Sequence, residues 1–418
     1  MTEAAFDAVT AGAGPVARGS VARVGAATAV AALCGYGVMY LAARRLEPAG
    51  FSVFGVFWGA FGVVTGAANG LLQEATREVR STATTPHTTK GPHTRPIRVA
   101  AGVGLAAAIA IAGTSALWAP HVFAESRPLS VALLSVGLAG FCMHATLLGM
   151  LAGAGRWSLY GSLMVTDAVT RVAVALAAFA FGWGLDGFLW ATVAGSLAWL
   201  LVLVASPTAR AASGLPTAGT ASGFLSGAAH SIAAAGASAI LVMGFPVLLK
   251  ATSGHLGAAG GVVILAVTLT RAPLLVPMTA MQGNLIAYFV DHRGARLRAL
   301  LTPASIIVAV GTAGVVAAFL LGPWILRTAF GADYQTSGCL LAWLTAAAVA
   351  IALLTLTGAA AVAAALHRAY AVGWVGATLA ATALLTLPLG LEQRTVVALL
   401  CGPLVGIAVH LAALARTA

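Results

Sequence analysis

Arg271 places a permanent positive charge near the middle of an otherwise apolar stretch, within TLTRAPLLVPMTAMQGN at 268–284. A buried arginine needs an anionic or hydrogen-bonding partner, because burying an uncompensated charge is costly. Its planar guanidinium matches phosphate oxygens through two parallel hydrogen bonds. The residue therefore predicts either an anion-binding site or an ion pair with an acid elsewhere in the chain, such as Asp167 or Glu74.

Pro273 and Pro277 follow Arg271 on the same stretch. A proline inside a helix removes one backbone hydrogen bond and clashes with the carbonyl four residues earlier. We therefore expect this segment to kink beside Arg271 and to act as a hinge.

Asp167 and Arg171 are a second pair of opposite charges inside an apolar stretch. Their spacing places both side chains on one face of a helix, where they can pair. One interpretation is a structural ion pair. The other is that Arg171 also binds an anion, while Asp167 tunes it or takes up a proton. Arg23 and Glu74, near the ends of two other apolar runs, are further candidates for charge chemistry.

The composition excludes a soluble globular protein. Of 418 residues, 60% are hydrophobic and only 8% are charged, with a mean hydropathy of +0.97, whereas soluble domains hold about 25% charged residues. The apolar runs are continuous and about 20 to 30 residues long, which suits membrane-spanning helices and not the roughly 10-residue alternating strands of a barrel. The sequence therefore predicts an all-α integral membrane protein.

Twelve apolar runs are long enough to cross a bilayer, at 21–43, 52–76, 97–119, 129–152, 158–182, 186–205, 223–249, 259–289, 299–325, 338–364, 369–389 and 393–414. With the N-terminus inside, the inner connections hold 14 lysines and arginines and the outer ones hold 6. Because these residues favour cytoplasmic loops, we expect a multi-pass protein of a bacterial plasma membrane with both termini in the cytoplasm. The net charge of +11 fits this bias and an attraction to anionic headgroups, and it requires no nucleic acid.

The two halves of the chain resemble each other at an offset near 206. Asp186 in GLDG then falls on Glu392 in GLEQ, and GAGRWSLYG after the fourth run resembles ALHRAYAVG after the tenth. Six runs per half is an even number, so both halves enter the membrane in the same direction. We therefore predict a monomer with two pseudo-symmetric six-helix lobes, 1–205 and 223–418, around a central cavity, joined by a cytoplasmic Ser/Thr/Gly/Pro-rich linker at 206–222.

Two stretches resemble a known family. YLAARRLEPAGFSVFGVFW at 40–58 is similar to the start of Wzx-like polysaccharide-biosynthesis flippases, where a short Arg/Leu/Gly/Pro turn joins two helices. TRAPLLVPMTAMQGN at 270–284 resembles the eighth helix of the same group, in its actinobacterial branch. The resemblance implies the multidrug/oligosaccharidyl-lipid/polysaccharide (MOP) exporter superfamily, whose two lobes rock about a cationic cavity. It places Arg271 in that cavity and Arg23 near its cytoplasmic mouth.

The function implied by this resemblance is flipping of a polyprenyl-phosphate- or pyrophosphate-linked glycan to the outer leaflet for cell-envelope polysaccharide assembly. Arg271, Arg171 and Arg23 are then expected to bind the phosphate. Four amide side chains are expected to bind sugar hydroxyls: Asn69, Gln73, Gln282 and Asn284. The expected partners are this substrate, membrane lipids and glycosyltransferases of the same pathway.

Two other function classes stay open. A cation-coupled multidrug antiporter of the same fold would favour unpaired acids, whereas the deep charges are two arginines and one aspartate. A membrane-embedded glycosyltransferase needs paired carboxylates or metal ligands, and the sequence offers no such spacing, so we expect neither an enzyme nor a metal site. The sequence contains no GxxxxGK[ST] loop, so we expect no ATP use and no cofactor, with coupling to H+ or Na+ through Asp167 or Glu74 left open.

Overall fold

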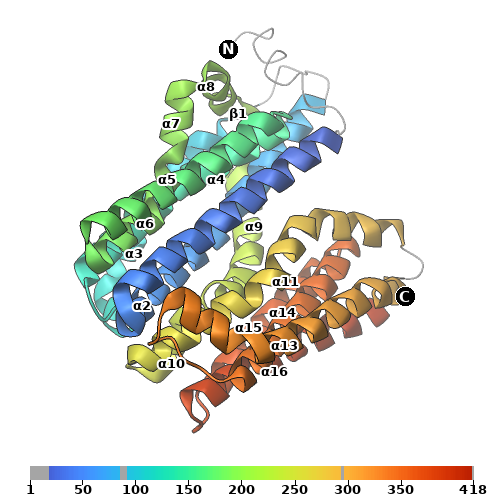
Figure 1. Ribbon diagram of the computed structural model, residues 1–418. Helices are drawn as coiled ribbons and strands as arrows, with labels where there is room; N and C mark the ends of the chain where they lie inside the picture. Colours follow the sequence, from blue (N-terminus) through green and yellow to red (C-terminus); the bar gives the residue numbers. More distant parts are fainter. Residues whose placement is uncertain (1–17, 85–91, 293–295, 417–418) are drawn as a thin grey trace. The chain divides into compact units, whose positions relative to one another are not determined.

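The computed structural model describes residues 18–84, 92–292 and 296–416, and these are almost entirely helical (Figure 1). The elements follow in the order α2 (Arg18–Thr84), β1 (His93–Thr94), α3 (Pro96–Val122), α4 (Arg127–Gly153), α5 (Trp157–Phe181), α6 (Gly184–Ala194), the 3₁₀ turn η1 (Gly195–Leu197), α7 (Ala198–Ala205), α8 (Pro207–Ser213), β2 (Thr217–Ala218), α9 (Ala221–Val242), α10 (Phe245–Ser253), α11 (Gly257–Asp291), α12 (Arg296–Ala299), α13 (Leu301–Phe330), α14 (Gly338–Ala363), α15 (His367–Leu385) and α16 (Leu391–Ala415).

Eleven helical stretches in the described ranges are long and apolar enough to cross a membrane. The longest, Ala22–Thr82, has 61 residues, about three times the roughly 20 that a crossing needs. α2 is interrupted at Glu47 (φ 55°, ψ 170°), directly before Pro48, because the residue before a proline avoids the helical region and proline has no N–H to donate. α2 therefore provides two crossings, and the predicted multi-pass protein with twelve membrane-spanning helices is confirmed.

The chain forms two compact units. The first unit is Met1–Ala42 with Ala60–Ala239, and the second unit is Ala43–Gly59 with Ile240–Ala418. Both α2 and α9 therefore contribute residues to each unit. These units are defined by contacts between residues, whereas the lobes 1–205 and 223–418 are defined by the repeat in the sequence. The two lobes therefore stay a prediction.

The turns that follow α4 and α14 have the same local backbone, as the predicted repeat requires. Gly155 and Ala365 both have a left-handed backbone, with φ of 70° and 59°. The next residues share their dihedral angles, with φ/ψ of −84°/57° at Arg156 and −88°/55° at Leu366. Each of these two residues donates its N–H to the carbonyl five positions earlier, at 2.8 and 2.9 Å. The turns lie 210 positions apart, so the local offset is slightly larger than the predicted one.

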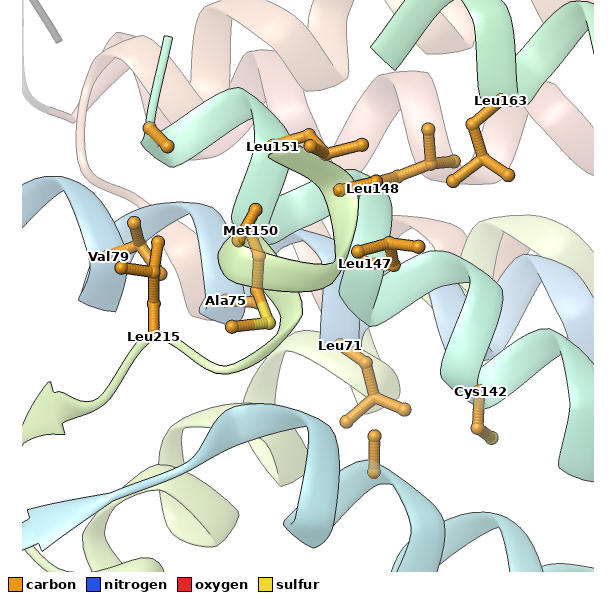
Figure 2. Close-up of a cluster of buried hydrophobic side chains, with 14 of the residues drawn as sticks. Leu71, Ala75, Val79, Cys142, Leu147, Leu148, Met150, Leu151, Leu163 and Leu215 are labelled. Atoms are coloured by element: carbon orange, nitrogen blue, oxygen red, sulfur yellow. The ribbon is translucent and has the colours of Figure 1, made fainter. Parts of the chain in front are cut away.

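Residues 206–222, which their composition predicts as a linker, fold onto the first unit. Ser206 caps α8 by accepting a hydrogen bond from the N–H of Ala209 at 3.1 Å, and β2 pairs antiparallel with β1. Ala209 and Leu215 are fully buried, and Figure 2 shows Leu215 beside Val79 of α2 in the hydrophobic core. Serine and proline are also favoured at helix N-termini, so this composition is compatible with a folded segment, and the role of 206–222 as a linker between lobes stays a prediction.

Tyr334 holds the turn inside α2 within the second unit. Its hydroxyl donates to the carbonyl of Ala43 at 3.1 Å, and its ring lies edge-on to that of Phe51 with centroids 6.1 Å apart. Burial raises the pKa of the Tyr334 hydroxyl, and the charges of Asp333 and Glu47 add to the rise. Tyr334 is therefore a neutral hydrogen-bond donor at physiological pH.

Glycines along the second half of α2 pack against neighbouring helices. In the first unit, a Cβ on Gly70 would collide with the backbone nitrogen of Ile232 in α9. In the second unit, a Cβ on Gly59 would lie 3.0 Å from the carbonyl oxygen of Met243. Small residues let helix backbones approach closely within a membrane, so these glycines form a packing surface.

Gly70→Ala is expected to destabilise the first unit by about 1–3 kcal/mol, the usual cost of overpacking, because the backbone of α9 must move to admit a methyl group. Gly113→Ala on α3 is the matched control, since a Cβ there meets nothing within 4 Å and alanine is the better helix former. Thermal unfolding in detergent should show a lower midpoint for Gly70→Ala only. A wild-type midpoint for Gly70→Ala would contradict the packing role.

Candidate functional site

Arg271 lies in α11 and is held at the junction of α9 and α10. Only 7% of the residue is exposed. Its Nη1 donates to the carbonyl of Val242 at 3.1 Å, and its guanidinium carbon lies 5.3 Å from the ring centroid of Phe245. All three residues belong to the second unit. A carbonyl dipole and an aromatic face therefore both stabilise the positive charge.

Pro246 explains why this carbonyl is available to an arginine. α9 ends at Val242 and α10 begins at Phe245. In a continuous helix the carbonyl of Val242 would accept a hydrogen bond from residue 246, but proline has no N–H. The guanidinium of Arg271 supplies the missing donor. The seventh membrane-spanning helix is thus broken at this point, whereas hydropathy alone predicts one continuous run at 223–249.

α11 is not broken at its own prolines. It runs as a single helix through Pro273 and Pro277, and both prolines are exposed. Membrane helices tolerate proline because neighbouring groups satisfy the backbone atoms that it frees. A chain break beside Arg271 is found in the adjacent helix, and the predicted kink in α11 stays a prediction. A hinge function for the two prolines stays a prediction.

Arg171 and Asp167 pair along α5 in the first unit, as their spacing predicts. The Nη2 and Nε of Arg171 donate to Oδ1 of Asp167 at 2.9 and 3.1 Å. Nη1 donates to the carbonyl of Thr192 at 2.9 Å, and the guanidinium carbon lies 5.5 Å from the ring centroid of Phe61. The predicted ion pair is confirmed, and an anion-binding role for Arg171 stays a prediction.

The sixth membrane-spanning helix changes geometry where it meets this ion pair. The 3₁₀ turn η1 separates α6 from α7. A change from α-helical to 3₁₀ bonding leaves one backbone carbonyl without its usual donor. Here the carbonyl of Thr192 accepts a hydrogen bond from Arg171 instead. A Cβ on Gly195 would collide with Oδ1 of Asp167 and lie 2.6 Å from Nε of Arg171. Glycine at this position therefore lets η1 pack directly on the pair.

Arg171 and Arg271 share one arrangement in two different units. Each guanidinium bonds a carbonyl at a break in a membrane-spanning helix and lies over a phenylalanine ring. A guanidinium has five N–H donors in a fixed plane, so one group can bridge a helix break and also bind an anionic oxygen. This chemistry suits recognition of an anion.

Glu74 is also engaged within its own helix. It is 3% exposed and accepts two hydrogen bonds from Arg77, at 2.5 and 3.1 Å. Gly227 of α9 packs against its carboxylate, with no room for a Cβ. Asp167 and Glu74, the acids that the sequence offers as partners for Arg271, are thus each bound by an arginine of the same helix.

The remaining candidate residues lie in less buried positions. Arg23 donates from Nη1 to a serine hydroxyl at the start of α5 at 3.2 Å. Gln73 and Asn284 are exposed, and Asn69 is partly buried. The side chain of Gln282 lies outside the described part of the structure. Binding of a substrate by these residues stays a prediction.

The aromatic rings and the helix breaks were not predicted from the sequence. Phe61 and Phe245 are far along the chain from the arginines that they contact, so only the fold brings them together. One signal was present, because Gly-Phe-Pro at 244–246 inside an apolar run is typical of an interrupted helix. In the described ranges, no group of three or more His, Cys, Asp or Glu side chains is placed to hold a metal ion.

Close relatives of the chain are found among mycobacterial proteins, although no protein-family model matches it. The uncharacterized proteins Mb3654 of Mycobacterium bovis and Rv3630 of Mycobacterium tuberculosis are each 71% identical to it over 404 residues, which is 97% of this chain and 94% of theirs. The uncharacterized protein Rv1510 of Mycobacterium tuberculosis is 68% identical over 403 residues, covering 96% of this chain and 93% of its own.

Solved structures of transporters share the fold. An inward-facing multidrug resistance MATE family transporter of the MOP superfamily matches with a TM-score of 0.70 and 13% identity, over 100% of this chain and 99% of that one. An outward-facing one matches with a TM-score of 0.63 and 14% identity over the same shares. A MOP superfamily transporter from Pyrococcus furiosus matches at 0.62 and 14%, over 95% and 96%. The resemblance to the superfamily is thus confirmed for the fold, and its Wzx-like branch stays a prediction. The chain has the fold of MOP superfamily transporters and belongs to the family of Mb3654, Rv3630 and Rv1510.

Proposed function

We propose that this chain is a flippase that moves a polyprenyl-phosphate- or pyrophosphate-linked saccharide from the inner to the outer leaflet. Arg271 is the main phosphate contact in this proposal, and Arg171 and Arg23 add to it. The saccharide contacts are amide side chains: Asn69, Gln73, Gln282 and Asn284.

The observation that carries the proposal is the sign of the charge within the membrane-spanning helices. Arg271 is buried, with its charge stabilised by a carbonyl and a ring. Asp167 and Glu74 are both bound by arginines. Intramembrane charges commonly mark a substrate pathway, and an excess of guanidinium over carboxylate favours an anionic substrate over a cationic one.

The binding pocket is not of one polarity in all solved transporters of this fold. The MOP superfamily transporter from Pyrococcus furiosus is described by a binding pocket of reverse polarity that suggests a different function. The fold therefore does not by itself require a cationic substrate, and the charges of this chain's own residues carry the proposal.

Outward movement of a phosphate requires no ATP. Each negative charge that leaves an inside-negative cell gains about 2.3 kcal/mol per 100 mV of membrane potential. Transporters of this fold have been solved in inward-facing and outward-facing conformations, and we propose that this chain alternates in the same way. Proton or sodium coupling through Asp167 or Glu74 is an additional driving force in this scheme.

A cation-coupled multidrug antiporter is the second candidate. It is supported by the solved neighbours, which include multidrug resistance MATE family transporters. In an antiporter, Asp167 or Glu74 would have to release its arginine partner during the cycle, and its carboxylate would then bind a proton or a cationic drug. The two candidates therefore differ in the charge of the transported molecule, which can be measured directly.

Flipping in proteoliposomes tests the proposal. The probe is a short-chain polyprenyl-phosphate glucose with an NBD fluorophore on its lipid tail, and dithionite reports which leaflet holds it. Wild type is expected to flip the probe, and Arg271→Ala to flip it at least about tenfold more slowly, since a hydrogen bond to a charged group is worth about 1.5–3 kcal/mol. Arg327→Ala, which removes an exposed arginine of α13, is the matched control and should resemble wild type.

Two other results would each contradict part of the proposal. If wild-type protein leaves the lipid probe in place but extrudes ethidium when a proton gradient is applied, the antiporter replaces the flippase. If wild type and Arg271→Ala flip equally fast, the flippase stands and Arg271 is not its phosphate contact.

A further inference from the structure

A groove on the first unit begins close to Arg171, because its lining residue Ala194 directly precedes Gly195, whose Cβ would lie 2.6 Å from Nε of Arg171. It has a volume of about 490 Å³ and runs between α5 and α6. Its lining consists of Val174, Trp183, Asp186, Gly187, Trp190 and Ala194. Both tryptophans are 53% exposed, so their rings are accessible to a ligand.

Glycines shape the turn that forms the head of this groove. Gly182 ends α5 with a left-handed backbone (φ 69°), and Gly184 begins α6 with φ of 62°. A Cβ on Gly187 would lie 2.7 Å from the Cβ of Ala178 in α5 and 2.7 Å from that of Trp183, so glycine lets α6 approach α5 closely. The GWGLDG turn thus places Trp183 at the head of the groove, and Trp190 follows about one turn beyond Asp186 along α6.

The groove is polar at one end and apolar along the rest of its length. The exposed carboxylate of Asp186 is fixed near the turn, where Oδ1 accepts a hydrogen bond from the hydroxyl of Ser126 at 2.6 Å. Ala194 lies eight positions further along the helix, about 12 Å away at 1.5 Å per residue. Other large apolar side chains of these helices are exposed, among them Leu176 and Phe179, as is typical of a surface that contacts acyl chains. The groove therefore suits a ligand with a polar head and an apolar tail.

We propose that this groove binds a bilayer lipid whose headgroup carries an ammonium ion. The carboxylate of Asp186 attracts a positive headgroup and repels an anionic one. Tryptophan is the best aromatic partner for a cation, and Trp183 stands beside Asp186 at the polar end. The acyl chain lies along Trp190 and Val174. This site and the proposed transport substrate differ in charge, so each stands without the other.

Native mass spectrometry of the full-length protein in detergent tests this site. The probes are dioleoyl phosphatidylethanolamine and dioleoyl phosphatidylglycerol, which share acyl chains and phosphate and differ in the ammonium group. Wild type is expected to retain the first lipid about fivefold better than the second. Asp186→Asn should abolish this preference, because asparagine keeps the oxygen that accepts from Ser126 and loses only the charge. Trp190→Leu should weaken retention of both lipids.

Trp324→Leu is the matched control, because Trp324 is a 60% exposed tryptophan of α13 in the other unit, and it should retain lipids as wild type does. Equal retention of the two lipids by wild type would overturn the proposal, as would an unchanged preference in Asp186→Asn. Thermal midpoints equal to that of wild type will show that both groove variants are folded, as expected for exposed side chains.

Discussion

Gly195→Ala is expected to lower the stability of the first unit by about 3 kcal/mol, although alanine is the better helix former by about 1 kcal/mol. The added methyl would occupy the place of Oδ1 of Asp167 and would lie 2.6 Å from Nε of Arg171. The carboxylate must then rotate away and release the guanidinium, and separating a partly buried ion pair is costly. Thermal unfolding in detergent, followed by tryptophan fluorescence, should show a clearly lower midpoint. Gly102→Ala on α3 is the control, since a Cβ there meets nothing within 4 Å.

A double-mutant cycle with Asp167→Ala shows whether the ion pair is the cause. Once Asp167 is truncated, the methyl at position 195 no longer meets a carboxylate, so Gly195→Ala should cost less than it does in the wild type. The coupling is expected to exceed about 0.5 kcal/mol, the limit for independent sites. Additive effects of the two substitutions would mean that Gly195 is required for another reason, such as its approach to the backbone of α5.

The general fold could be predicted because a bilayer imposes strong rules. A helix must satisfy its own backbone and reach across the hydrocarbon core, so runs of apolar residues predict crossings directly. The similarity of GAGRWSLYG and ALHRAYAVG predicted a repeat, and the turns at Gly155 and Ala365 have almost the same backbone. Hydropathy could not predict the break of the seventh helix, because Pro246 is itself compatible with an apolar run.

The sequence predicted the charged residues of the candidate site, but it did not predict the groups that surround Arg271. The spacing of Asp167 and Arg171 predicts their pairing, since residues four apart share one helical face. Two partners of Arg271 could not be predicted, because one is a backbone carbonyl and the other is a phenylalanine on a different helix. Neither a carbonyl nor one phenylalanine among many apolar residues carries a sequence signal. Only the position of Pro246 indicated where a donor would be missing.

Arg271→Ala is expected to have two separable effects, one on stability and one on transport. The substitution removes the donor for the carbonyl of Val242, and an unsatisfied buried carbonyl costs about 1–3 kcal/mol. Pro246→Ala restores an N–H that can bond the same carbonyl within a continuous helix. The double variant Arg271→Ala/Pro246→Ala should therefore regain most of the stability that Arg271→Ala loses. The thermal midpoints of the four proteins in detergent measure this recovery.

Flipping by the same proteins then separates the structural role of Arg271 from binding of a phosphate. Pro246→Ala and the double variant share the repaired helix and differ only in the arginine. If Arg271 contacts the substrate, the double variant should flip the polyprenyl-phosphate probe at least about tenfold more slowly than Pro246→Ala. Equal rates in these two proteins would mean that Arg271 only bridges the break between α9 and α10. If the double variant stays as unstable as Arg271→Ala, the hydrogen bond to Val242 is not the stabilising contribution of the arginine. The N–H introduced at position 246 would then have restored no lost stability.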